Sequence, residues 1–332
     1  MDIEYKLDLL FEKHAILKGH LKGKADVAFL EQHNNAPDDL EFTTAVDKHI
    51  LENYASLNGA VIYMCITCRP DITYALSKTS KGMHNPKPRH VLMLKQLLHY
   101  LYRAKDLCLV YSRESPSMYS TLKDIARSDA ALSFMASSDG QHVRRFLGFA
   151  DANYANITDD ERKSNTGFVF FLFGCAIIWK SKLQPITATS THEAELIACA
   201  SAAMEAIWCR KLLLDLGFAF DLRPIAARDD SLKRKLECDG VFVSDDAYEL
   251  DPLWLLNDNL GTTQTINNPN SASPGTKHID TRFFRVRQWI SQSALRVAYV
   301  GTDFNIADFF TKGLQWPKFS KFRDRIGMRR KN

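Results

Sequence analysis

Apolar residues recur at helical spacing through the first 112 residues of the chain. The stretch SLNGAVIYMCITC is apolar on nearly all sides, and RPDITYALSKTS carries a proline at an early helical position, where proline is well tolerated. Within RHVLMLKQLLHYLYRAK, one stripe is formed by Val91, Leu94, Leu98 and Leu101. The pattern predicts a small helical unit over residues 1–112 that ends in a short strand at 107–111.

From residue 145 the pattern changes to short apolar segments that are typical of strands. Residues 145–151 alternate, residues 167–173 and 176–182 form a predicted hairpin around Gly174 and Cys175, and further strands are predicted at 253–256 and 295–300. Helical patterns occupy residues 191–216 and 279–291, and a last helix is entered through TDFNIADFFTKGL. This order predicts an α/β domain over residues 145–332, with a mixed five-stranded sheet flanked by helices.

Two polar segments interrupt this organisation. Residues 113–144 are rich in Ser, Asp and Arg and are predicted to be a linker. Residues 218–251 contain ARDDSLKRKLECDG, a charged and poorly periodic stretch that indicates an insertion in the α/β domain.

Composition narrows the class of protein only slightly. With 45% hydrophobic and 25% charged residues the chain is globular, and a net charge of +4 permits a nucleic-acid partner without requiring one. Seven cysteines, mostly within apolar segments, indicate buried thiols in a reducing, intracellular compartment, cytoplasmic or nuclear. Cys65 and Cys68 form one C-x-x-C without a second pair, which favours core packing over zinc. The most apolar run, residues 168–179, is shorter than the ~20 residues of a membrane helix, so no membrane partner is expected.

The helix at 191–216 separates the roles of two acids. Ser190 and Glu193 fit a capping box, and Gly217 stands where a C-terminal glycine is expected. Glu195 lies two residues after Glu193 and therefore points to the opposite side. Its small neighbours would let the helix approach a sheet closely: Ala194, Ala198, Cys199 and Ala202. Glu195 is the acid that remains available for chemistry.

Three further acids follow apolar segments. Asp151 and Asp258 each end a predicted strand, and Asp308 lies in FNIADFFTKGL. Taken singly, each has a structural explanation as a turn former or a helix-start acid. Together with Glu195 they would bring four carboxylates to one edge of a sheet, where ligands gather in open α/β folds. Such a cluster repels itself unless cations neutralise it, and all-oxygen ligands suit Mg²⁺ or Mn²⁺. Two such ions can activate water and stabilise the leaving oxygen of a phosphodiester, which is nuclease chemistry.

Several segments in a fixed order identify a resemblance. GFADANYANITDDERKSNTGFVFFLFGCAIIWKSKLQPITATSTHEAELIACASAAMEAIW, LLNDNLGTTQTI, TKHIDTRFFRVR and FNIADFFTKGL resemble the ribonuclease H domain of copia-type long-terminal-repeat retrotransposon Pol polyproteins, over residues 146 to about 328. Upstream, residues 54–111 look like the segment that connects the polymerase to this domain, and residues 5–30 resemble the polymerase end more loosely.

The resemblance implies a ribonuclease H-like fold and hydrolysis of the RNA strand of RNA–DNA hybrids. By motif position, the catalytic and metal-binding residues would be Asp151, Glu195, Asp258 and Asp308, with two Mg²⁺ or Mn²⁺ ions. The partners would be an RNA–DNA hybrid and the rest of a Pol polyprotein. A polymerase would need a catalytic Asp-Asp pair. The Asp-Asp dipeptide in VSDDAY lies in the insertion and has the wrong neighbours for such a pair, so polymerase activity is not expected.

Two motifs are candidates for substrate contacts. Arg162, Lys163, Ser164 and Asn165 precede the hairpin and could hold phosphates, although a solvated turn explains them equally well. Lys277, His278 and Arg282 match the KHID motif, where a structural role for the histidine is the better-supported reading.

Departures from the family pattern keep alternatives open. Tyr154 stands where the family usually has tryptophan, and Asn153 replaces a frequent acid. Both changes leave the four carboxylates intact, but the insertion at 218–251 lies just before the strand that bears Asp258. This insertion and the expected 5′ truncation of the element favour the principal alternative, a catalytically inactive retroelement relic or a host-retained nucleic-acid-binding module. A two-metal nuclease of the integrase type, which typically uses three acids, is a third hypothesis.

Overall fold

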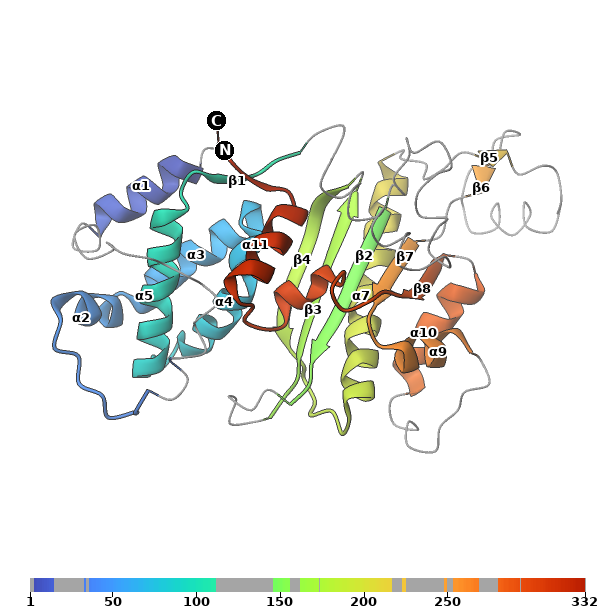
Figure 1. Ribbon diagram of the computed structural model, residues 1–332, viewed down its shortest axis with the longest axis horizontal. Coiled ribbons are helices and arrows are strands. Elements are labelled where there is room, and N and C mark those ends of the chain that lie inside the picture. The colour runs from blue at the N-terminus through green and yellow to red at the C-terminus, as the bar shows by residue number, and fades with distance from the viewer. Residues whose placement is uncertain are drawn as a thin grey trace.

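The computed structural model describes residues 3–14, 33, 36–111, 146–155, 162–172, 174–216, 223–224, 248–249, 253–268, 280–292 and 294–331 (Figure 1). The predicted linker at 113–144 lies outside the described residues, as does Gly217. Of the predicted insertion at 218–251, the structure describes two short strands that pair antiparallel, β5 (Arg223–Pro224) and β6 (Tyr248–Glu249).

A mixed five-stranded sheet forms the centre of the molecule. Its strands are β2 (Phe146–Asn153), β3 (Asn165–Leu172), β4 (Cys175–Leu183), β7 (Leu253–Asn257) and β8 (Leu295–Tyr299). They lie in the order β4-β3-β2-β7-β8, with β4, β3 and β2 antiparallel and β2, β7 and β8 parallel. The predicted fold class is confirmed, and this sheet with its helices is compatible with a ribonuclease H-like fold.

Both faces of the sheet are buried, because successive side chains alternate between two cores. In β2, Leu147 and Phe149 enter one core, whereas Phe146 and Ala150 enter the other. Figure 1 shows the corresponding arrangement: helices α1 to α5 and α11 lie on one side of the sheet, and α7, α9 and α10 lie on the other.

Helices of the N-terminal third cover the first face. They are α1 (Ile3–Lys13), α2 (Ala45–Glu52), α3 (Tyr54–Cys68), α4 (Thr73–Thr79) and α5 (Pro88–Arg103), with 3₁₀ turns at η3 (Pro70–Ile72) and η4 (Ser80–Gly82). The stripe predicted in α5 is fully buried, in one continuous core with Phe149 of β2 and Phe171 of β3. The Trp179 indole of β4 also donates a 3.1 Å hydrogen bond to the Cys65 carbonyl of α3. Helices and sheet are therefore stabilised together.

The C-terminal residues complete this face. The 3₁₀ turn η7 (Ile306–Phe310) and helix α11 (Trp316–Arg325) pack into the same core, through Phe310 and Phe322 among others. Strand β9 (Met328–Arg330) pairs antiparallel with β1 (Leu107–Leu109), the short strand predicted at the end of the helical unit. The sequence predicts a helix entered through residues 302–314, but the first turn there is 3₁₀ and the α-helix starts only at Trp316.

Helices α7 (Thr191–Asp215), α9 (Leu260–Asn267) and α10 (Asp280–Ser291) cover the second face. Ala198, Cys199 and Ala202 are fully buried and let α7 lie close to β2, as predicted. The Ser190 hydroxyl accepts the Glu193 N–H at 3.1 Å, which confirms half of the capping box. The Glu193 carboxylate binds the N–H and the hydroxyl of Thr189. Helix α9 was not predicted.

The described cysteines are free thiols. Cys65 is buried in the helical core beside the Thr73 hydroxyl, in agreement with the packing prediction, whereas Cys108 is exposed. None of the described helices has the length and apolar character that crossing a membrane requires.

The continuous core predicts cooperative unfolding of the helical third and the sheet. Leu98→Ala, at a fully buried position of α5, is expected to lower the free energy of unfolding by about 2–5 kcal/mol. The loss should be equal whether unfolding in urea is followed by far-ultraviolet circular dichroism or by tryptophan fluorescence. Leu51→Ala in α2, at a side chain that is 38% exposed, is the control and should cost far less. Two separate transitions in the wild-type chain would contradict the shared core.

Candidate metal centre

Three of the predicted acids meet at one edge of the sheet. Asp151 lies near the end of β2, Asp258 directly follows β7, and Glu195 lies in the second turn of α7. Each offers a carboxylate oxygen, and these oxygens all lie within 4.8 Å of one another. Parallel pairing brings the ends of β2 and β7 together, and the close approach of α7 adds Glu195.

Two buried asparagines hold this arrangement in place. Asn257 donates from its side-chain amide to the Ala150 carbonyl at 3.1 Å and to the Glu195 carboxylate at 2.9 Å. Asn305 donates to the same carbonyl at 3.1 Å and to the Asp258 carboxylate at 3.0 Å. Both amides thereby tie a carboxylate to the β2 backbone beside Asp151. The sequence offered one weak signal for them: each is a polar residue beside or within an acidic motif.

The third carboxylate is held by Thr311, whose hydroxyl donates to Asp151. Thr311 can reach it because η7 lies directly on β3 at Gly167, the residue paired with Asp151. A Cβ atom at Gly167 would come within 2.6 Å of Thr311 Cγ2 and 2.8 Å of Phe310 Cβ. Glycine at this position is therefore what allows the close approach.

Asp308 lies near this group but is engaged differently. It is fully buried in η7, and its two carboxylate oxygens each lie 2.6 Å from a lysine ammonium, Lys312 at Oδ1 and Lys318 at Oδ2. Among the described residues, the set of carboxylates with ligand spacing is Asp151, Glu195 and Asp258, without Asp308.

Burial and mutual repulsion disfavour charge on the carboxylates. Burial, then Asp308 and Asp258, raise the pKa of Asp151 to about 7. Burial and then Asp151 raise the pKa of Glu195 well above its usual range, although the Asn257 hydrogen bond opposes the shift. A divalent cation would remove the repulsion, and the donor set fits Mg²⁺ or Mn²⁺ because it consists of carboxylate oxygens. This acidic cluster could therefore bind a metal ion.

The residues predicted for substrate contacts have different surroundings. Arg162 is exposed and has a positive φ of 46°. Ser164 and Asn165 are buried: the Ser164 hydroxyl accepts the Ala155 N–H at 3.2 Å, and the Asn165 amide donates to Ser181 and to the Phe310 carbonyl. These two side chains have structural roles, and phosphate contacts by Arg162 and Lys163 stay a prediction.

The KHID motif is only partly described. Lys277 and His278 lie outside the described residues, and Arg282 lies in α10. Their roles stay predictions.

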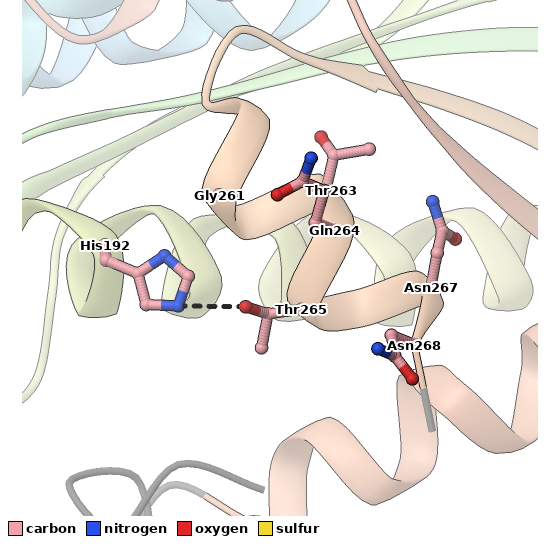
Figure 2. Close-up of a pocket in the computed structure, with 7 residues that line it drawn as sticks. All are labelled: His192, Gly261, Thr263, Gln264, Thr265, Asn267 and Asn268. Atoms are coloured by element: carbon pink, nitrogen blue, oxygen red, sulfur yellow. Dashed lines mark hydrogen bonds between the residues drawn. The ribbon is translucent and has the colours of Figure 1, made fainter. Parts of the chain in front are cut away.

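A pocket of about 630 Å³ lies between the start of α7 and α9 (Figure 2). It is lined by His192, Gly261, Thr263, Gln264, Thr265, Asn267 and Asn268. The His192 ring is placed by Thr262 at 3.2 Å and Thr265 at 3.4 Å. His192 belongs to the same helix as Glu195, one turn before it, and Gly261 follows Asp258 by three residues.

Comparison with known proteins finds similarity to Pol polyproteins of transposons. It is 29% identical over 275 residues to the retrovirus-related Pol polyprotein from transposon TNT 1-94 of Nicotiana tabacum, covering 83% of this chain and 16% of that protein. The Pol polyprotein from transposon RE1 of Arabidopsis thaliana is 28% identical over 277 residues, 83% of this chain and 15% of the relative. The chain thus spans a small part of these relatives. The secreted RxLR effector protein 161 of Plasmopara viticola is 28% identical over 155 residues, 47% of this chain and 89% of its own length. No family model matches the chain.

These similarities support a retroelement Pol region.

The raised pKa of Asp151 predicts a pH dependence of stability without metal. Its folded pKa of about 7 exceeds its ordinary value of 3.8, so between these pH values the unfolded state binds fewer protons and is favoured as pH rises. In EDTA, the urea midpoint should fall between about pH 4 and pH 7, and Asp151→Asn should flatten that fall. An unchanged slope in the variant would contradict the assignment.

The amide contacts predict a loss of metal affinity when Asn257 is replaced. Asn257→Ala releases Glu195 and should weaken Mn²⁺ binding about 10- to 100-fold, as measured by calorimetry. Asn267→Ala is the control, because Asn267 also donates its amide to a backbone carbonyl, that of Val297, but at the far end of α9. Equal losses in both variants would contradict a specific role for Asn257.

Proposed function

We propose that this chain is a metal-dependent ribonuclease H region of a retroelement Pol polyprotein that hydrolyses the RNA strand of RNA–DNA hybrids. The observation that carries the proposal is the convergence of Asp151, Glu195 and Asp258 at one edge of a mixed sheet. Homology to transposon Pol polyproteins over 83% of the chain supports the same assignment.

Divalent cations, when bound at such a site, activate water and stabilise the oxygen that leaves the phosphodiester. The residues of the chain supply orientation. Asn257 and Asn305 fix Glu195 and Asp258, and Thr311 fixes Asp151, so that the carboxylates face a common position. Because these ligands are already in position, their side chains need not reorganise when the substrate binds.

The hybrid is proposed as the substrate on two grounds beyond homology. The chain has a net charge of +4, which is compatible with a polyanion. The pocket between α7 and α9 offers hydroxyl and amide groups, which suit contacts with the sugar hydroxyls that distinguish RNA from DNA. The remainder of a Pol polyprotein is the proposed macromolecular context, and polymerase activity by this chain alone is not proposed.

The second candidate is a module that binds nucleic acid without cutting it. The engagement of Asp308 with two lysines favours it, because only three of the four acids of the motif series then remain for metal.

A pair of substitutions on one helix separates the candidates. Glu195→Gln removes a proposed ligand and should reduce cleavage of a labelled RNA–DNA hybrid in Mg²⁺ by more than about 100-fold, beyond the loss typical of outer partners. Glu205→Gln, also on α7, removes a carboxylate whose contact is a surface ion pair with Lys180 at 3.7 Å, and should leave the rate unchanged.

DNA duplex and RNA duplex of the same sequence serve as substrate controls and should stay intact. If the wild-type chain binds the hybrid but cuts no more than Glu195→Gln, the non-catalytic candidate is correct. Cleavage of DNA duplex at an equal rate would show a nuclease of another specificity.

A further inference from the structure

Asp308, the fourth carboxylate of the motif series, has a lysine ammonium of the same chain beside each of its two oxygens. Asp308 is 0% exposed, and the Nζ atoms of Lys312 and Lys318 lie 2.6 Å from Oδ1 and Oδ2. A metal ion on Asp308 would share one carboxylate with two ammonium groups. Asp308 therefore differs from Asp151, Glu195 and Asp258, which accept hydrogen bonds from the neutral side chains of Thr311, Asn257 and Asn305.

Charge balance favours this arrangement over two metal ions. Four ionised carboxylates carry four negative charges, and the two lysines together with one divalent ion supply four positive charges. A second divalent ion would leave the centre with an excess of two positive charges in a largely buried place, where unbalanced charge is costly.

We infer that the centre holds one divalent ion, on Asp151, Glu195 and Asp258, and that the Lys312 ammonium takes the place of a second ion. The catalytic meaning of this inference rests on the proposed nuclease function, but its ion count does not. Lys312 supplies a fixed positive charge next to the position where a phosphodiester would meet the ion.

Of the two lysines, Lys312 is the one assigned this role. Burial opposes the charge on Lys312, but the carboxylates of Asp151 and Asp308 raise the pKa of its ammonium above the usual value, and its side chain is 38% exposed. It reaches Asp308 from four residues further along the chain, just after η7. Lys318 lies in α11, and its ammonium is also 5.3 Å from the centre of the Phe322 ring. Its role is to neutralise and position Asp308 through Oδ2.

The test counts bound ions in the full chain. Calorimetry and electron paramagnetic resonance of free Mn²⁺ should give one ion per wild-type chain. Lys312→Gln frees one oxygen of Asp308 and should give two, whereas Lys312→Arg keeps the charge and should give one. Lys180→Gln is the matched control, because it removes a lysine paired with a carboxylate elsewhere, Glu205, and should leave the count at one.

Two ions on the wild-type chain would overturn the inference and leave the nuclease proposal standing. No ion at all would overturn both. A count of one in folded Lys312→Gln, with folding checked by circular dichroism, would show that Lys312 does not stand in for a second ion. If that variant does not fold, the ion counts of the wild type and of Lys312→Arg still test the inference, because both chains should bind one ion.

Discussion

Repulsion among carboxylates at the end of β2 is the constraint that the surrounding structure must satisfy. Three carboxylates within 4.8 Å of one another, with Asp308 nearby, cannot all carry charge in a buried place without compensation. The structure compensates in three ways: neutral amides and a hydroxyl fix the geometry, two lysines neutralise Asp308, and the remaining charge is left for a cation. The need to compensate the carboxylate charge explains why these polar residues are buried at the edge of the sheet.

Much of the site was predictable because strand ends and helix caps are local features. Asp151 and Asp258 follow apolar strand segments, and parallel pairing brings the ends of such strands together. Glu195 followed from the capping role of Glu193, whose N–H is bound by the Ser190 hydroxyl and whose carboxylate also binds Thr189. The state of Asp308 was not predictable, because it depends on a 3₁₀ turn that brings Lys312 back and on a helix that carries Lys318. The Ala150 carbonyl that joins Asn257 and Asn305 has no signature in the sequence at all.

The fold shows the same division between local and distant determinants. The pattern of apolar residues predicted the five strands and α7 with small errors in their bounds, because it indicates directly which positions are buried. The same pattern did not predict that the helical third and the sheet share a core, because an apolar helix face has the same sequence pattern whichever element packs against it. Helix α9 escaped prediction because LGTTQTIN is mostly polar or small and is stabilised by an Asn259 cap and by packing against α7.

The pairing of β1 with β9 has a consequence for how the chain is made. Leu107 is placed opposite Arg330, so the ribbon cannot form until residues 328–330 have been synthesised. The helices of the first third likewise pack against apolar residues that are synthesised much later, such as Phe319 and Met328. Until then their apolar faces lack this cover, and apolar surface exposed during folding promotes aggregation.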